Sequence, residues 1–301
     1  DAIGDSEKPC LVLDIGINSA ADAGTDIRML LNVRCGENER SIEVADFRNS
    51  GSLSSLNNLN ARFGAYARVF LGPKYSVSGT INQTGRSRFV QKLAGDSVES
   101  TVLEMTTEIK LAQTEIKGPA LVVNGPPLEW SEKDLHLSLS MSLNEGPAGS
   151  FLKISQAKLD ASTVSVEGTF DSADLAQLRA AARPNTQPVQ SWLNALPRTT
   201  LKARASAEAL NRLQTLRVLA SETLLLGDLV LNTEYDPAAK EVQIPQLEFK
   251  GSAFEAKVGA TKIKASAIGL LLDSGENALS KWAQAVPGLT FDFKAHSPVL
   301  A

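Results

Sequence analysis

Residues whose types and spacing could support catalysis are sparse in this chain. Its two histidines, His136 and His296, each lie on the polar side of an alternating run, where a lone histidine is usually a solvated side chain rather than a general base. The two cysteines have no paired histidines to complete a zinc site, and no G-x-S-x-G, P-loop or H-E-x-x-H motif is present. The sequence therefore predicts a protein that is not an enzyme, holds no metal and needs no cofactor.

The cysteines, Cys10 and Cys35, flank two alternating apolar runs that predict a hairpin around a polar loop at 18–25. A register that places Cys10 opposite Cys35 brings the thiols into bonding range, whereas one that aligns Leu11 with Val33 separates them. A β-bulge would satisfy both demands, so we expect a disulfide rather than two buried thiols. Such a bridge would place the protein in an oxidising compartment.

Composition narrows the possible functions further. The chain has 301 residues, of which 43% are hydrophobic and 21% charged, which is typical of a folded protein with a core. Its net charge of −4 and its dispersed Lys and Arg argue against nucleic acid as a partner. No run approaches the roughly 20 apolar residues of a spanning helix.

The elements that must position any site are predominantly strands, and they repeat. Self-similarity at a fixed period indicates stacked supersecondary units. The matched residues, 90 positions apart, are Ile154 and Ile244, Gln156 and Gln246, Leu159 and Phe249, Ser162 and Ser252, Trp192 and Trp282, and Pro197 and Pro287.

Period-two alternation gives many of these strands one apolar face and one polar face, most clearly at 135–143. Short connections predict antiparallel meanders. We therefore expect a mainly β fold: an antiparallel, repeat-built curved sheet, either a β-groove or a half-barrel, with a few short helices. We expect one helix that begins at Asp171 and others at 86–94, 189–196 and 277–286. The later strands are expected at 200–206, 224–232, 254–258, 263–271 and 289–295.

The expected domain organisation is one continuous sheet, because no Pro-, Gly- or Ser-rich linker interrupts the chain. Residues 1–60 form an N-terminal hairpin region and residues 61–150 the middle strands of the same sheet. Residues 151–301 hold two repeat units, one at 154–243 and a truncated one at 244–301.

Several apolar faces carry small residues where a self-filled core would need bulk, and few helices are available to cover them. Acyl chains would fill such a groove without needing polar partners. The alternative is that helices and sheet curvature close the core. The residues expected to contact lipid are Leu135, Leu137, Leu139, Met141, Phe254, Ala256, Ile263, Ala265, Ala267, Phe291 and Phe293.

Three stretches resemble one known family. VSVEGTFDSADLAQLRAA from Val164, LLLGDLVLNTEYD and VQIPQLEFKGSAFEAKVGA are similar to AsmA-like proteins, the bacterial envelope family with TamB- and YhdP-type bridges. The resemblance covers residues 150–301 and more weakly the rest. It implies a periplasmic β-groove that takes part in phospholipid movement or outer-membrane biogenesis, tethered to the inner membrane by a segment outside this sequence.

Together these features predict a periplasmic lipid-binding or lipid-transfer β-groove. Its expected partners are a phospholipid or another acyl-chain lipid, with envelope proteins in addition. The alternative is a non-enzymatic envelope scaffold that docks partners by its strand edges. An enzyme ranks third.

Overall fold

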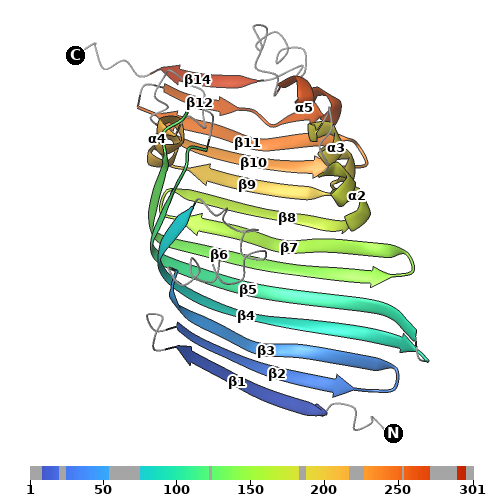
Figure 1. The fold of residues 1–301 in the computed structure, drawn as a ribbon. Helices are drawn as coiled ribbons and strands as arrows, with labels where there is room; N and C mark the ends of the chain where they lie inside the picture. The colour runs from blue at the N-terminus through green and yellow to red at the C-terminus, as the bar shows by residue number, and fades with distance from the viewer. Residues whose placement is uncertain are drawn as a thin grey trace. The chain divides into compact units, whose positions relative to one another are not determined.

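The computed structural model describes residues 9–19, 25–53, 75–95, 97–121, 124–182, 188–216, 227–252, 254–271 and 290–295. Its strands form a mainly β, antiparallel sheet of 14 strands, as predicted. The hydrogen-bonded order follows the chain from β1 to β12 and ends with β14, while β13 pairs with β11 (Figure 1). The strands at the two ends of this order, β1 and β14, do not pair with each other, so the described sheet is not closed.

Contacts divide the chain into two compact units. The first consists of residues 1–150, 157–162 and 216–218, and the second holds the remainder, so β7 (Gly149–Ala161) contributes to both.

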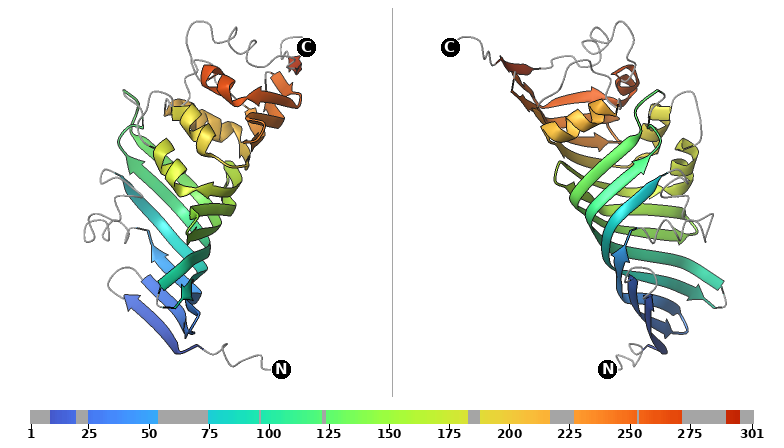
Figure 2. Two further views of the ribbon diagram at one scale, coloured as in Figure 1. Left: turned by 90° about the vertical axis from the view of Figure 1, so that its right-hand side faces the viewer. Right: turned by 60° about the vertical axis from the view of Figure 1, so that its left-hand side comes forward.

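The first unit is built from long strands that follow one another along the chain, with short connections between β2 and β3 and between β4 and β5. In this unit, β4, β5 and β6 are visibly bent along their length (Figure 2). Its strands are β1 (Leu11–Ser19), β2 (Thr25–Cys35), β3 (Glu39–Ser52), β4 (Ser76–Ala94), β5 (Ser97–Gly118) and β6 (Leu128–Gly146).

Register shifts interrupt these strands at three places: within β3 between Val44 and Phe47, and between β4 and β5 at Gly79 and near Leu93. Compared with both of its neighbours, β3 holds one extra residue between Val44 and Phe47, a bulge that turns both side chains to the same face. Without it, the odd spacing of Val44 and Phe47 would place one of them on the polar face. The second irregularity lies between β4 and β5, where Gly79, with φ of 123°, opposes Gln113 and its neighbour. A Cβ on Gly79 would lie 2.7 Å from the Gln113 carbonyl oxygen, so only glycine fits.

The second unit combines shorter strands with helices. Figure 1 shows α2, α3 and α5 beside one end of its strands and α4 at the other end. Its strands are β8 (Val164–Asp174), β9 (Thr199–Ala205), β10 (Gly227–Asp236), β11 (Glu241–Gly251), β12 (Phe254–Val258), β13 (Thr261–Lys264) and β14 (Phe291–Ala295). Its helices are α2 (Leu175–Ala181), α3 (Pro188–Ala195), α4 (Ala207–Thr215) and α5 (Ala265–Leu271).

A small core forms where these helices meet the sheet. Tyr235 of β10, Leu193 of α3 and Ala265 of α5 are buried together, with Val242 and Ile268 packed around them. The Tyr235 hydroxyl donates a hydrogen bond to the Leu193 carbonyl at 2.6 Å, which satisfies the polar tip of a buried aromatic ring. Burial, and to a smaller extent the neighbouring Asp236 carboxylate, raises the pKa of Tyr235.

The 90-residue repeat appears in the element bounds. The helices α2 (Leu175–Ala181) and α5 (Ala265–Leu271) are displaced by that same interval, and so are the ends of β7 and β11 at Ala161 and Gly251. The β-repeat organisation is therefore present in the structure. The second tryptophan of the repeat, Trp282, and the helix expected at 277–286 lie outside the described residues.

Three features of the secondary structure were not anticipated correctly: two expectations were wrong and one helix was missed. Residues 263–271 do not form one strand: β13 ends at Lys264 and α5 begins at Ala265. The small residues there alternate by coincidence, whereas Ala265 and Ile268 lie three positions apart and contact one core, as helix positions do. Residues 86–94 are strand rather than helix, because Ser87 and Phe89 alternate with exposed Arg86 and Arg88 within β4.

The third miss is α4. Its first turn is capped from two sides: the Ser206 hydroxyl accepts from the Ala209 amide at 3.3 Å, and the Asp228 carboxylate accepts from the Ala207 amide at 3.0 Å. Arg212 and Glu208 then form a pair one turn apart. The serine cap was readable in the sequence, whereas the second cap comes from a distant residue. None of the described helices is long and apolar enough to cross a membrane.

Candidate functional site

The candidate site begins on β6, where four predicted lipid-contacting residues share one face. Leu135, Leu137 and Met141 lie opposite Leu111, Ile109 and Met105 of β5, so the antiparallel register brings apolar side chains together in pairs. Leu139 lies opposite Thr107, and none of the four β6 residues is buried. The period-two reading of this strand is confirmed.

The strand register aligns the apolar residues of β6 with residues on the same side of the other strands of the first unit. The row that starts at Leu143 of β6 is apolar across all six strands and ends at Leu11 of β1, whereas the other rows also contain polar or small residues, chiefly in β4. We call the apolar residues of these rows the apolar face of the first unit: Leu11, Leu13, Ile15, Ile17, Ile27, Met29, Leu31, Val33, Ile42, Val44, Phe47, Ile81, Phe89, Leu103, Met105, Ile109, Leu111, Leu135, Leu137, Leu139, Met141 and Leu143.

Exposure shows how this face differs from an ordinary core. None of its residues is among the buried residues of the chain, and Leu11 and Ile17 are 47% and 56% exposed. No large side chain of the described residues is fully buried. An apolar sheet face covered by a second protein layer would hold many such side chains. Within the first unit, no described element forms a second layer over this face.

Polar and small residues interrupt the face near its middle. Gln83 donates a hydrogen bond to the Thr107 hydroxyl at 3.4 Å, and Gly85 and Ser87 lie on the same side of β4. These residues contribute little apolar surface, so the large apolar side chains of the face are concentrated toward the ends of its strands.

The opposite face of the same strands is charged and hydroxylated. His136 lies opposite Lys110, and its Nε2 atom is 4.0 Å from a carboxylate oxygen of Glu108. A hollow of about 530 Å³ adjoins these strands, and its lining includes Asp134 and Asp160 together with Ile81, Leu111 and Leu135 of the apolar face. The His136 side chain is 40% exposed as a whole, but its Nε2 atom is buried and has no hydrogen-bond partner among the described residues, so the expectation of a fully solvated histidine holds only in part. The other histidine, His296, lies outside the described residues.

A buried carboxylate in the first unit was not anticipated from the sequence. Glu132 of β6 is only 4% exposed and accepts hydrogen bonds from the Ser162 hydroxyl at 2.7 Å and the Trp130 indole nitrogen at 3.2 Å. Glu132 lies two residues after Trp130 and four after Leu128, so it is on the same side of β6 as these two residues. That spacing was the only sign in the sequence that Glu132 would be buried. Satisfied hydrogen bonds explain how a carboxylate is accommodated there, so we assign it a structural role.

In the second unit, a group of phenylalanines holds three of the predicted site residues. The rings of Phe254 and Phe293 stack with centroids 5.5 Å apart, and Phe249 lies 4.9 Å from Phe254. Phe293 is 57% exposed, and Ala256 lies between Phe249 and Phe293 in the strand register. We call Phe249, Phe254, Ala256 and Phe293 the aromatic patch. Phe291 lies opposite Val258 in β14, but its side chain is outside the described part.

Charged residues occupy the intervening positions of the same three strands. Glu248, Lys257 and Asp292 form one cross-strand row, and Lys250, Glu255 and Lys294 form the next with the opposite signs. The hydrogen bond from Lys257 to Glu248, 2.9 Å long, lowers the pKa of Glu248 and raises that of Lys257. These residues, with Phe249, Ala256 and Phe293 of the aromatic patch, border a hollow of about 630 Å³. Alternating signs suit surface pairing rather than the capture of one charged ligand.

The remaining three predicted residues do not lie on a strand face beside the others. Ala265 and Ala267 belong to α5, and Ala265 is 3% exposed within the helix–sheet core. Ile263 is on β13 but is buried, at 4% exposure. The expected strand through Ala265 and Ala267 is not formed, because α5 begins at Ala265. Ala265 is buried with Leu193 of α3 and Tyr235 of β10, whereas Ala267 is half-buried.

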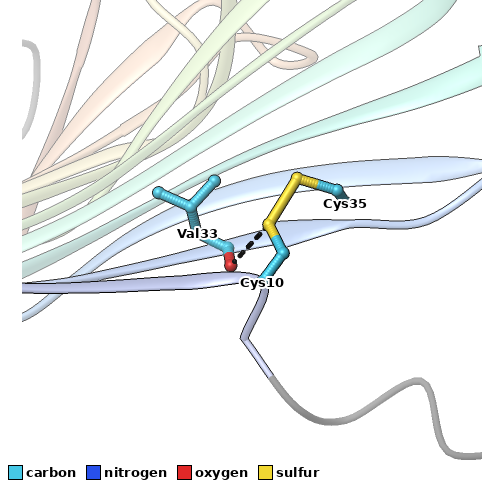
Figure 3. Close-up of a disulfide and its surroundings, with 3 residues drawn as sticks. All are labelled: Cys10, Val33 and Cys35. Atoms are coloured by element: carbon cyan, nitrogen blue, oxygen red, sulfur yellow. Dashed lines mark hydrogen bonds between the residues drawn. A yellow bond between two sulfur atoms is a disulfide. The ribbon is translucent and has the colours of Figure 1, made fainter.

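The hairpin disulfide is present. Cys10 and Cys35 are bonded, with their Cα atoms 6.1 Å apart (Figure 3). Leu11 nevertheless faces Val33, and no register shift interrupts β1 and β2. Instead, Cys10 lies just outside β1 and its backbone amide donates to the Val33 carbonyl at 2.8 Å, so the irregularity falls at the end of the strand. The Cys10 sulfur also lies 3.2 Å from that carbonyl oxygen, a contact without a donor hydrogen.

The described residues contain no group of three or more His, Cys, Asp or Glu side chains arranged to hold a metal ion. Chemically, the arrangement offers extended apolar contact and surface ion pairs. No family model matches the chain, and searches of curated proteins and of solved structures found no match.

Proposed function

We propose that this protein binds the acyl chains of lipids along the apolar face of the first unit and acts in lipid transfer within a bacterial envelope. The observation that supports this most is the combination of register and exposure: apolar side chains align across six neighbouring strands, and none of them is buried. Large exposed apolar patches mark interaction sites in proteins.

The dimensions suit a lipid tail. Six strands about 4.8 Å apart give a face roughly 24 Å wide, and the hydrocarbon core of a bilayer is about 30 Å thick, or about 15 Å for each leaflet. A tail can therefore lie across the strands within this face. The polar headgroup would stay in water at the rim, which avoids the cost of burying it.

The expected affinity favours transfer over storage. Burial of one methylene contributes about 0.8 kcal/mol, so ten methylenes that each lose half of their water contact contribute on the order of 4 kcal/mol. That free energy corresponds to binding in roughly the millimolar range for one tail. A lipid held this weakly can enter and leave the face quickly.

Two separate observations support the proposed compartment. The Cys10–Cys35 disulfide is typical of proteins in oxidising environments, including the bacterial periplasm. The sequence resemblance to AsmA-like envelope proteins supports the same location. Envelope proteins remain the proposed partners on this basis.

A matched pair of substitutions tests lipid binding. Leu137→Lys places a charge on the apolar face opposite Ile109, whereas Ser138→Lys places the same side chain on the other face, opposite Glu108. Equilibrium titration with phospholipid vesicles carrying a fluorescent acyl chain, compared at equal folded protein, should show weakened lipid binding for Leu137→Lys and unchanged binding for Ser138→Lys.

Two outcomes would contradict the proposal. If the unsubstituted protein shows no acyl-chain binding at equilibrium with phospholipid vesicles, the apolar face does not bind acyl chains. If both variants lose lipid equally, binding does not depend on this face, and a scaffold that docks partners through strand edges becomes the better explanation.

A further inference from the structure

The first strand of the sheet has an open edge. Among the described strands, β1 pairs only with β2, and this pairing runs from Leu11 to Ser19 without a register shift (Figure 1). Natural edge strands are commonly protected by proline, lysine, a bulge or short length. β1 has nine residues, contains neither proline nor lysine, and carries one charged residue, Asp14.

The side chains of β1 make that edge apolar as well as open. Leu11, Leu13, Ile15 and Ile17 belong to the apolar face of the first unit and are 37–56% exposed. A strand that is long, regular and apolar at its edge offers both backbone hydrogen-bonding groups and side-chain contacts to another strand.

We propose that β1 pairs with β1 of a second copy of this chain, antiparallel about a twofold axis at Ile15. In this register Leu13 lies opposite Ile17 of the other copy, so apolar residues meet on one face. Asp14, the only charged residue of the strand, lies opposite Gly16, so the two carboxylates are diagonal neighbours and are not directly opposed.

Other registers are less favourable for reasons that the strand itself supplies. Shifting the pairing register of the two β1 strands by one residue places the apolar side chains of one copy beside the polar side chains of the other. A twofold axis at Asp14 sets the two carboxylates opposite each other, and an axis at Leu13 or Gly16 leaves part of the nine-residue strand unpaired. The Ile15 register pairs the whole strand.

This dimer would join the apolar faces of the two copies on one side of a common sheet, because directly opposed residues point to the same side. The Cys10–Cys35 disulfide would hold the Leu11 end of β1 against β2 and keep the edge in place. The inference concerns β1 alone and does not depend on whether the apolar face binds lipid.

Charge substitutions at Gly16 test the register. A Cβ at this position meets no atom within 4 Å, so a side chain is accommodated. In the dimer, position 16 faces Asp14 of the second copy at two symmetric places. Gly16→Lys should therefore tighten the dimer and Gly16→Asp should weaken it, each by about twofold to thirtyfold in Kd, since cross-strand pairs contribute about 0.2–1 kcal/mol each.

Effects on folding run in the opposite direction. Within one copy Gly16 lies opposite Arg28, so aspartate at position 16 is favourable for the hairpin and lysine is unfavourable. Circular dichroism and urea unfolding of each variant measure this effect separately. A change in dimerisation that merely followed fold stability would rank the two variants in reverse.

The measurement is sedimentation velocity of the intact, oxidised chain over a range of concentrations. We expect a closed monomer–dimer equilibrium with Kd lowest for Gly16→Lys, intermediate for the unsubstituted chain and highest for Gly16→Asp. The proposal is overturned by a chain that stays monomeric at every concentration, by open-ended association, by equal Kd values, or by the reverse order.

Discussion

Replacing Gly79 by alanine should be the most damaging single methyl addition in the first unit. Gly79 has φ of 123°, which L-residues rarely adopt, and its Cβ would approach the carbonyl oxygens of Gln113 and Ala112 to 2.7 and 2.8 Å. Strained backbone conformations of this kind cost about 1–3 kcal/mol, and overpacking against neighbouring atoms costs about 1–3 kcal/mol more. We expect Gly79→Ala to reduce the free energy of unfolding by about 3 kcal/mol or more.

Two other glycines separate these contributions. Gly95 also has a positive φ, 63°, but a Cβ there meets no atom within 4 Å, so Gly95→Ala should cost only about 1 kcal/mol. Gly16 is equally open and has no positive φ, so Gly16→Ala should be neutral or stabilising by up to about 1 kcal/mol.

The assay is urea unfolding followed by circular dichroism, with the midpoint and slope compared across the three variants. The expected order of stability is Gly16→Ala, then Gly95→Ala, then Gly79→Ala. If Gly79→Ala is as stable as Gly16→Ala, the bend between β4 and β5 does not have the geometry described, and the derivation of the site from this register fails with it.

Two further predictions concern the disulfide and the helix–sheet core. Free-thiol titration of the unfolded, unreduced protein should detect no thiol from Cys10 or Cys35. For a loop with a sequence separation of 25, removing the disulfide should lower the free energy of unfolding by up to about 3.5 kcal/mol. This loss should appear as faster hydrogen exchange in β1, and unchanged exchange would contradict it. Because its pKa is raised in the folded state, Tyr235 contributes stability that is present below the ordinary tyrosine pKa of about 10 and is lost as the pH rises through the folded value. Tyr235→Phe should therefore flatten the fall in stability above about pH 10. At neutral pH it should lower the free energy of unfolding by about 1–3 kcal/mol, because it removes the donor to the Leu193 carbonyl. An unaltered pH profile would show that another group controls the fall.

The sequence predicted the strands best where alternation was unbroken. Leu135, Leu137, Leu139 and Met141 alternate with polar residues, so their common face followed from period two alone. The disulfide was also predictable, because two cysteines flanked one recognisable hairpin. Its location just outside the regular register was not, since a strand end leaves the backbone free to deviate.

The sequence was least informative where two periods fit the same residues. Ala265 and Ala267 satisfy alternation, but the helical spacing of Ala265 and Ile268 matches the core that the structure forms. The 90-residue repeat could have corrected this prediction. Residues 265–271 correspond to residues 175–181, which were expected to be helical. The bulge before Phe47 and the bend at Gly79 depend on cross-strand pairing and cannot be read from one strand alone.

The most direct test of an open, lipid-binding apolar face measures acyl-chain proximity at two adjacent residues. A fluorescent label is placed on a cysteine introduced at Leu137 or at Ser138, which face opposite sides of β6, with the Cys10–Cys35 disulfide intact. Phospholipid carrying a spin label within its acyl chain is then added. We predict strong quenching at position 137 and little at position 138. Equal quenching at both positions, or none at position 137, would contradict binding of lipid tails on the apolar face of the first unit.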